Sequence, residues 1–160
     1  MINDPMRALA WMVGLEDVTF LGLEPGELVA SVAPRALGTF AIGPDAASAL
    51  LVTIGDSPER LRSEAAFARL CGVAPIPASS GKTIRHRLHR GGDRSANRAL
   101  HIAVVVRMRY LERTRAYVAR RTAEGLSKPE IIRCLKRSLA REMFQALRED
   151  YAKLAAGLDL

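Results

Sequence analysis

Two adjacent serines in a cationic segment are the residues of this sequence best suited to chemistry. Ser79 and Ser80 stand directly before Gly81, after a stretch rich in Pro and Ala. The cations that follow are Lys82, Arg85, Arg87 and Arg90. A serine hydroxyl is a weak nucleophile unless a base takes its proton or nearby positive charge assists its attack. A flexible serine beside several guanidinium groups is the arrangement expected where a hydroxyl meets a phosphodiester.

Other interpretations of this segment remain open on spacing alone. Ser79-Ser80-Gly81 is also a common composition for a flexible turn. His86 and His89 do not predict a metal site, because no further ligands stand at suitable spacing. A hydrolase pair of Ser80 with His86 is disfavoured, since the nucleophile-elbow pattern is absent and no Asp is positioned to orient the histidine. His86 and His89 are therefore expected to contact nucleic acid or to be exposed.

The positive charge of the chain is concentrated in its middle. The 160 residues carry a net charge of +7. By segment the net charge is −4 over residues 1–81, +10 over 82–121 and +1 over 122–160. A block this basic predicts a polyanionic partner, with nucleic acid first among the candidates. The alternative is a solvated arginine-rich face.

Composition and periodicity predict an all-α, compact helical domain carrying one basic Ser/Gly loop. Apolar residues make up 49% of the chain but aromatics only 5%, which favours packed helices. The expected helices cover Leu28–Leu37 with a break at Pro34, Asp45–Ile54, a segment from the Ser57 N-cap to Gly72, Asp93 to Tyr110, Arg113–Glu124, and a long helix after the capping box Ser127-Lys128-Pro129-Glu130. The segment Pro75–Gly92 is expected to be a loop, with an extended stretch at Thr83–His89 left open.

The turn Ile42-Gly43-Pro44 predicts a helix-hairpin-helix-like element. Gly43 would let the backbone approach a phosphate held by the amides at the following helix N-terminus. The usual two-glycine form would need Gly where this chain has Ala41. An ordinary packing corner is the alternative.

The remaining features predict a soluble, cytoplasmic protein with no membrane partner. No apolar run approaches the ~20 residues that span a bilayer. The N-terminal residues lack the cations of a signal peptide. Cys71 and Cys134 are too few for a disulfide framework or a cysteine-rich zinc site, and both are expected to be buried.

An extended part of the chain resembles the C-terminal domain of the insertion-sequence 110/116/902 family of RNA-guided transposases. The resemblance runs through Phe40–Gly55, residues 59–63, APIPASSGKTIRHRLHRGGDRSANRAL (74–100) and residues 113–144, covering about 28–148. The family pattern falls here on Gly72, Pro75, Ser80, Gly81, Arg90, Gly91, Gly92, Asp93, Arg98 and Leu100. The domain is accordingly set at 28–150, with 1–27 unassigned (disordered or a remnant) and 151–160 as a tail.

The resemblance implies that Ser80 is a catalytic nucleophile that forms a transient phosphoserine link to a cut DNA strand. The residues expected to bind nucleic acid are Gly43, Lys82, Arg85, Arg87, Arg90, Gly91, Gly92, Arg94 and Arg98. The implied partners are DNA, a structured guide RNA, and either further copies of the chain or a full-length transposase.

One departure from the family limits the implied activity. Family members bind Mg²⁺ through four acidic residues on an N-terminal RNase H-like domain, and residues 1–27 hold acids without a strand pattern. No cofactor is therefore expected on this chain alone, and Mg²⁺ only together with the missing domain. The chain is expected to be a truncated or remnant transposase that does not cleave alone. A non-catalytic DNA- or RNA-binding module that modulates full-length transposases is the alternative, and a decayed reading frame is a third.

Overall fold

The described part of the chain is almost entirely helical. The computed structural model describes residues 25–55, 61–77, 86–87, 89 and 91–158. Within these residues the elements in chain order are α2 (Pro25–Val32), α3 (Pro34–Leu37), α4 (Pro44–Ile54), α5 (Glu64–Leu70), β1 (Ile76–Pro77), β2 (His86–Arg87), α6 (Arg94–Tyr110), α7 (Glu112–Ala123) and α8 (Lys128–Leu158). The predicted helical fold class is therefore confirmed, with one short strand pair added.

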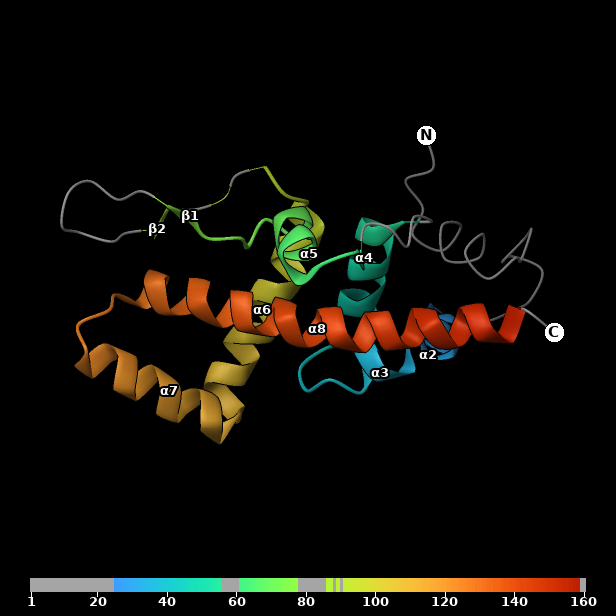
Figure 1. Cartoon of the computed structure of the whole chain (residues 1–160). Helices are drawn as coiled ribbons and strands as arrows, with labels where there is room; N and C mark the ends of the chain where they lie inside the picture. Colours follow the sequence, from blue (N-terminus) through green and yellow to red (C-terminus); the bar gives the residue numbers. More distant parts are fainter. Residues whose placement is uncertain (1–24, 56–60, 78–85, 88, 90, 159–160) are drawn as a thin grey trace.

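Helix α8 is the element on which most of the others pack. Figure 1 shows it running across the molecule, with α2, α3 and α4 grouped at its C-terminal half and α7 beside its N-terminal half. Leu139, Met143 and Leu147 of α8 are fully buried, and the helix contacts α2, α3, α5, α6 and α7. Full burial of an aliphatic side chain stabilises the folded state by about 1.5–3 kcal/mol. The core of this domain therefore lies around the middle of α8.

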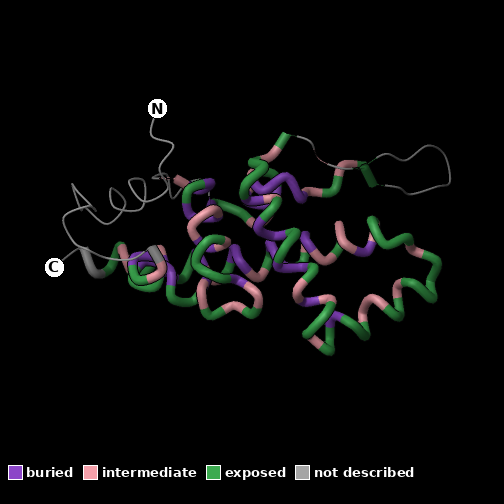
Figure 2. The backbone as a smooth tube through the Cα atoms, turned by 180° about the vertical axis from the view of Figure 1, so that it is seen from behind, coloured by how far each residue is buried: buried purple, intermediate pink, exposed green. Residues whose placement is uncertain are grey.

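The α7–α8 hairpin is much less buried than the core. Thr114 is the buried residue of α7, whose remaining side chains are exposed or half-buried. Figure 2 shows buried positions concentrated where α4, α5, α6 and α8 meet, and few along the hairpin. The N-terminal half of α8 is consequently less buried than the middle of the helix.

Several predicted helix ends are confirmed by their capping geometry. The Asp93 side chain accepts a hydrogen bond from the Ala96 amide at 2.8 Å, which fixes the start of α6. Pro34 separates α2 from α3, and Gly125, at φ +90°, follows α7. At α8 the Glu130 carboxylate accepts from the Ser127 amide at 2.9 Å. This is the glutamate half of the predicted capping box.

The single helix predicted from Ser57 to Gly72 is not continuous, because residues 62 and 63 belong to no helix. The helix begins at Glu64, and Ser63 is its N-cap, accepting from the Ala66 amide at 3.1 Å. Ser57 lies outside the described residues. Phe67 of α5 is fully buried, whereas Ala65 is exposed. Ser63 with Glu64 in the first turn is as good a start signal as Ser57, and the packing of Phe67 favours it.

The burial of the two cysteines and the end of α8 were also predicted from the sequence. Cys71 is buried as predicted, but Cys134 is exposed, because it lies on the part of α8 that faces α7 rather than the core. Helix α8 continues to Leu158, past the boundary predicted at residue 150. Among the described residues no helix has both the length and the apolarity needed to cross a bilayer.

Candidate nucleic-acid interface

The cationic Ser/Gly segment begins and ends at two glycines in direct backbone contact. Gly72 has φ +65°, a conformation that glycine adopts without strain. A Cβ added to Gly92 would lie 2.1 Å from the Gly72 amide nitrogen and 2.2 Å from its Cα. No side chain fits at Gly92 without moving the backbone. The contact brings the two ends of the segment 73–91 together.

Side chains of α6 and α8 stabilise this contact by hydrogen bonds. Asn97 of α6 donates from Nδ2 to the carbonyl oxygens of Cys71 and Gly72, at 3.0 and 2.9 Å. Lys136 of α8 donates from Nζ to Asn97 Oδ1 at 2.8 Å. We call Gly72, Gly92, Asn97 and Lys136 the hairpin base.

The Lys136 ammonium is set in an unusual environment for a lysine. Its side chain is 7% exposed. Burial, followed by repulsion from Arg133, lowers the pKa of Lys136 from its ordinary value. The hydrogen bond to Asn97 compensates part of this burial and orients the amide that holds the hairpin base.

A short strand pair extends from the hairpin base. Strands β1 and β2 are antiparallel, with Ile76 opposite Arg87 and Pro77 opposite His86. The predicted extended stretch is thus present at residues 86–87. The predicted residues Ser80, Lys82, Arg85 and Arg90, and Ser79 beside them, lie outside the described residues. In sequence Ser79, Ser80, Lys82 and Arg85 fall between the two paired strands, and Arg90 follows β2.

Apart from Gly43, the predicted nucleic-acid residues that are described lie in the region around this strand pair. Arg87 is exposed on β2, and Gly91 is exposed while Gly92 is half-buried. Arg94 and Arg98 are exposed on the first two turns of α6, where they line a shallow hollow next to the hairpin base. These five positions therefore share one region of the molecule.

Gly43 belongs to a separate turn, between α3 and α4. It is exposed, is the N-cap of α4, and has extended backbone at φ −89° and ψ 178°. Ala41 has φ +68°, so the position at which the two-glycine hairpin would have Gly adopts the left-handed conformation here too. Arg107 donates from Nε to the Phe40 carbonyl at 3.0 Å, which ties this turn to α6.

Arg107 belongs to the basic block 82–121, but it is not part of a free positive face. Its side chain is buried and makes a bidentate pair with Glu142 of α8, at 2.7 and 3.2 Å. Glu142 is partly exposed and also lies 3.7 Å from Arg113. A buried guanidinium needs such a partner, because an unpaired buried charge is costly. Arg107 therefore links the α3–α4 turn, α6 and α8.

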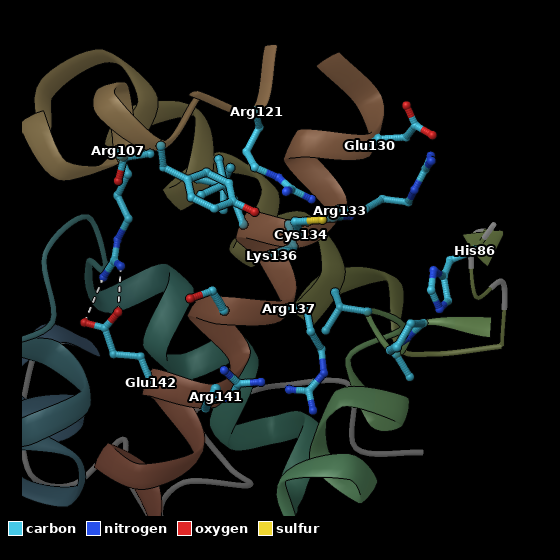
Figure 3. A pocket seen from close by; sticks show the side chains of 18 of the residues that line it. His86, Arg107, Arg121, Glu130, Arg133, Cys134, Lys136, Arg137, Arg141 and Glu142 are labelled. Carbon is cyan, nitrogen blue, oxygen red and sulfur yellow. Dashed lines mark hydrogen bonds and ion pairs between the residues drawn. The ribbon is translucent and has the colours of Figure 1, made fainter. Parts of the chain in front are cut away.

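A large cationic cleft lies between the strand pair, α6, α7 and the N-terminal half of α8. Its volume is about 1240 Å³. Figure 3 shows Arg121 of α7 and Arg133 of α8 projecting into it, with His86 of β2 on the far side. Its arginine and lysine side chains are Arg87, Arg107, Arg113, Arg121, Arg133, Lys136, Arg137 and Arg141. The acidic side chains of this lining are Glu130 and Glu142.

Sequence reasoning missed most of this cleft. Arg133, Arg137 and Arg141 lie in the segment whose net charge is only +1, so their charge is hidden by acids elsewhere in that segment. The spacing of Arg133, Arg137 and Arg141 at four-residue intervals was the available signal, since it places all three on one face of a helix.

The described residues contain no group of three or more His, Cys, Asp or Glu side chains that could hold a metal ion.

Comparison with known proteins identifies the family. The profile of the transposase IS116/IS110/IS902 family matches residues 36–119, which include the α3–α4 turn, the hairpin base except Lys136, and Ser80. The chain therefore belongs to this transposase family, as its sequence resemblance implied.

A protein of Streptomyces coelicolor gives a longer alignment with this chain. It is named insertion element IS110 uncharacterized 43.6 kDa protein, and it is 32% identical over 124 residues. The alignment covers 74% of the present chain but 30% of that relative.

Proposed function

We propose that this chain acts in DNA transposition as a DNA-binding domain that carries the attacking serine, Ser80. The observation that supports this most is the hairpin base, which anchors both ends of the segment containing Ser80. A nucleophile must be held in a defined position relative to its substrate, and effective positioning lowers the barrier of such reactions by several kcal/mol. Family membership supplies the class of substrate.

In the proposed reaction the Ser80 Oγ attacks the phosphorus of a DNA phosphodiester. A bond forms between Oγ and phosphorus, and the bond from phosphorus to one sugar oxygen breaks. The serine proton passes to a base, and the departing sugar oxygen takes up a proton to become a hydroxyl. One phosphodiester is exchanged for another, so no oxidant, reductant or nucleotide is consumed. Lys82, Arg85, Arg87 and Arg90 are the candidates to stabilise the pentacovalent phosphate.

The described residues do not fit a metal site, and we derive no metal-assisted step from this chain. Mg²⁺ belongs to the proposal only through the acidic RNase H-like domain of the family. A guide RNA and assembly with other transposase chains are likewise proposed from family membership.

The α3–α4 turn is proposed to contact DNA phosphate as a helix-hairpin-helix-like element. Its support is the left-handed φ at Ala41 and the exposed N-terminus of α4 at Gly43. Backbone amides at such a helix start favour an anion.

The test of Ser80 is trapping of a covalent protein–DNA adduct. A full-length family transposase whose own serine is replaced by alanine supplies the acidic domain, the element's guide RNA and Mg²⁺ are added, and the DNA is end-labelled. We expect a denaturant-resistant labelled band at the mass of this chain plus DNA. The band should be lost with Ser80→Ala and retained with the control Ser79→Ala. Absence of the band from the wild-type chain, or its persistence with Ser80→Ala, would overturn the proposal.

A non-catalytic nucleic-acid-binding module is the second candidate. The cationic cleft favours it, because that surface lies among residues other than Ser80 and binding there needs no nucleophile. Such a module would bind nucleic acid equally well after Ser80→Ala, would weaken steeply with salt, and would form no adduct.

A further inference from the structure

We propose that the cleft between β2, α6, α7 and α8 binds the phosphate backbone of one DNA strand, without reading its sequence. This inference rests on the proposed function, because it places the path of the same DNA. It adds Arg121 and Arg133 to the residues that contact the strand. Neither residue stands in the cationic segment that contains Ser80.

The charge of the cleft fits a polyanion. Eight arginine or lysine side chains and two glutamates line it. Glu64 and Glu124, outside this lining, pair with three of the cations, which leaves a net charge of +4. These cations come from β2, α6, α7 and α8, and they surround the space rather than forming a flat patch. A walled cationic cleft suits a single strand, which can be contacted from several sides.

Part of the cleft is held in place before any ligand arrives. Glu64 of α5 pairs with Arg137 and with Arg141, the latter at 3.1 Å. These partners lower the pKa of the Glu64 carboxyl, so it stays ionised at neutral pH. On α7, Glu124 pairs with Arg121. The carboxylates therefore fix several guanidinium groups and reduce the ordering cost of binding.

Several arginine N–H donors of the cleft are available to a phosphate oxygen of a ligand. Arg121 Nε and Arg137 Nη1 are buried without a hydrogen-bond partner among the described residues. Arg87 and Arg133 make no ion pair with any residue that the structure describes. Unpaired buried donors are costly, and a phosphate oxygen that reached them after a small side-chain movement would recover part of that cost.

The other side chains of the cleft argue for the phosphates rather than the bases as the recognised groups. Besides the imidazoles of His86 and His89, Tyr117 is the aromatic side chain of the lining, and the guanidinium carbons of Arg120 and Arg121 lie 5.5 and 5.9 Å from its ring centroid. Its ring is therefore already engaged and offers little stacking surface to a base. Binding should depend on salt and only weakly on sequence.

The connection with the Ser80 segment favours DNA over RNA as the occupant. His86 and Arg87 of β2 line the cleft, and in sequence residues 78–85 connect β1 to β2. The strand that Ser80 attacks would need a cationic path close to these residues. RNA is the competing occupant, and binding measurements with both nucleic acids distinguish it from DNA.

The test compares two double variants that remove the same charge. Arg121→Gln/Arg133→Gln alters the cleft, and Arg69→Gln/Lys153→Gln alters exposed positions outside it. Affinity for fluorescein-labelled single-stranded DNA of mixed sequence, and for single-stranded RNA of the corresponding sequence, is measured by anisotropy over a range of salt concentrations. We expect the cleft variant to bind about tenfold or more weakly, and its salt slope to fall by about 1.4, since each phosphate contact on a single strand contributes about 0.7. The surface variant should change affinity less than about twofold.

Two additions keep the outcome decisive. Arg121→Lys/Arg133→Lys should restore most of the affinity and the salt slope, which a folding defect would not allow, and helical circular dichroism should match the wild type. Equal weakening by the cleft and surface variants would overturn the proposal. Loss of single-stranded RNA binding with unchanged DNA binding would overturn it as well. Neither result would affect the Ser80 adduct, so failure of the cleft and failure of the proposed function are distinguishable.

Discussion

Gly92 is the residue on which the geometry of the Ser80 segment depends most directly. A Cβ added to Gly92 would point at the Gly72 backbone, and the Arg69 carbonyl oxygen lies 2.9 Å from the position of that Cβ. We expect Gly92→Ala to lower the free energy of unfolding by roughly 1–3 kcal/mol, the usual cost of forcing extra volume into a packed site. Urea denaturation followed by circular dichroism measures this change.

Gly43→Ala is the matched control for this substitution. Nothing lies within 4 Å of a Cβ at Gly43, and its φ is negative. Its unfolding free energy should fall by less than about 1 kcal/mol, the modest cost of alanine at an N-cap. If Gly92→Ala were as well tolerated as Gly43→Ala, the close contact with Gly72 would not exist in solution.

The two cysteines should differ sharply in reactivity. Burial, together with the nearby Asp93 carboxylate, raises the pKa of the Cys71 thiol to about 12, whereas Cys134 is exposed. The thiolate is the reactive form. At pH 8 we expect a disulfide reagent to modify one thiol rapidly in the native protein and the second only on unfolding. Absence of the fast phase in Cys134→Ser would assign that phase to Cys134.

The same raised pKa predicts a pH dependence of stability. The folded-state pKa of Cys71 lies above the ordinary value of 9.0, so its contribution is complete below pH 9. It is lost as pH rises from 9 toward 12, because the unfolded chain gives up the proton first. Cys71→Ala should reduce this loss of stability at alkaline pH. An unchanged profile of unfolding free energy against pH in that variant would contradict the role of Cys71.

At the scale of elements, Asp150 joins α8 to the start of α3. Its buried carboxylate accepts from the backbone amides of Arg35 and Ala36, at 3.2 and 3.0 Å. We expect Asp150→Ala to lower the unfolding free energy by about 1–3 kcal/mol, because buried amides would be left unpaired. Chemical denaturation measures this.

The neighbouring Glu149 provides the control for Asp150. It pairs with Arg35 at 2.6 Å, but both side chains are about half exposed. Exposed ion pairs contribute roughly 0–1 kcal/mol, so Glu149→Ala should cost little. Equal costs for the two substitutions would show that Asp150 is not a cap for α3.

Element ends were predictable where the signal is local, and were not where packing between distant segments decides. The Asp93 cap, the Pro34 break and the Gly125 stop follow from residues next to one another. The start of α5 depends on burial of Phe67, which packs near Phe144 of α8, and the burial of Arg107 depends on Glu142. No short-range pattern reveals either pairing.

At the scale of the whole molecule, the fold gathers positive charge that the sequence distributes over two segments. The segment 82–121 supplies Arg87, Arg113 and Arg121, and the segment 122–160 supplies Arg133 and Arg137. The cleft brings them to one surface beside the hairpin base. The sequence pointed to nucleic acid through the first segment alone, and the helical arrangement adds the second.

The central claim, that Ser80 attacks DNA, is tested most directly by locating the covalent bond. The trapped protein–DNA adduct is digested with nuclease and protease, and tandem mass spectrometry identifies the residue that carries the nucleotide. We predict a nucleotide phosphate on Ser80 and none on Ser79. A nucleotide attached to Ser79, or to any other residue of the chain, would contradict the claim.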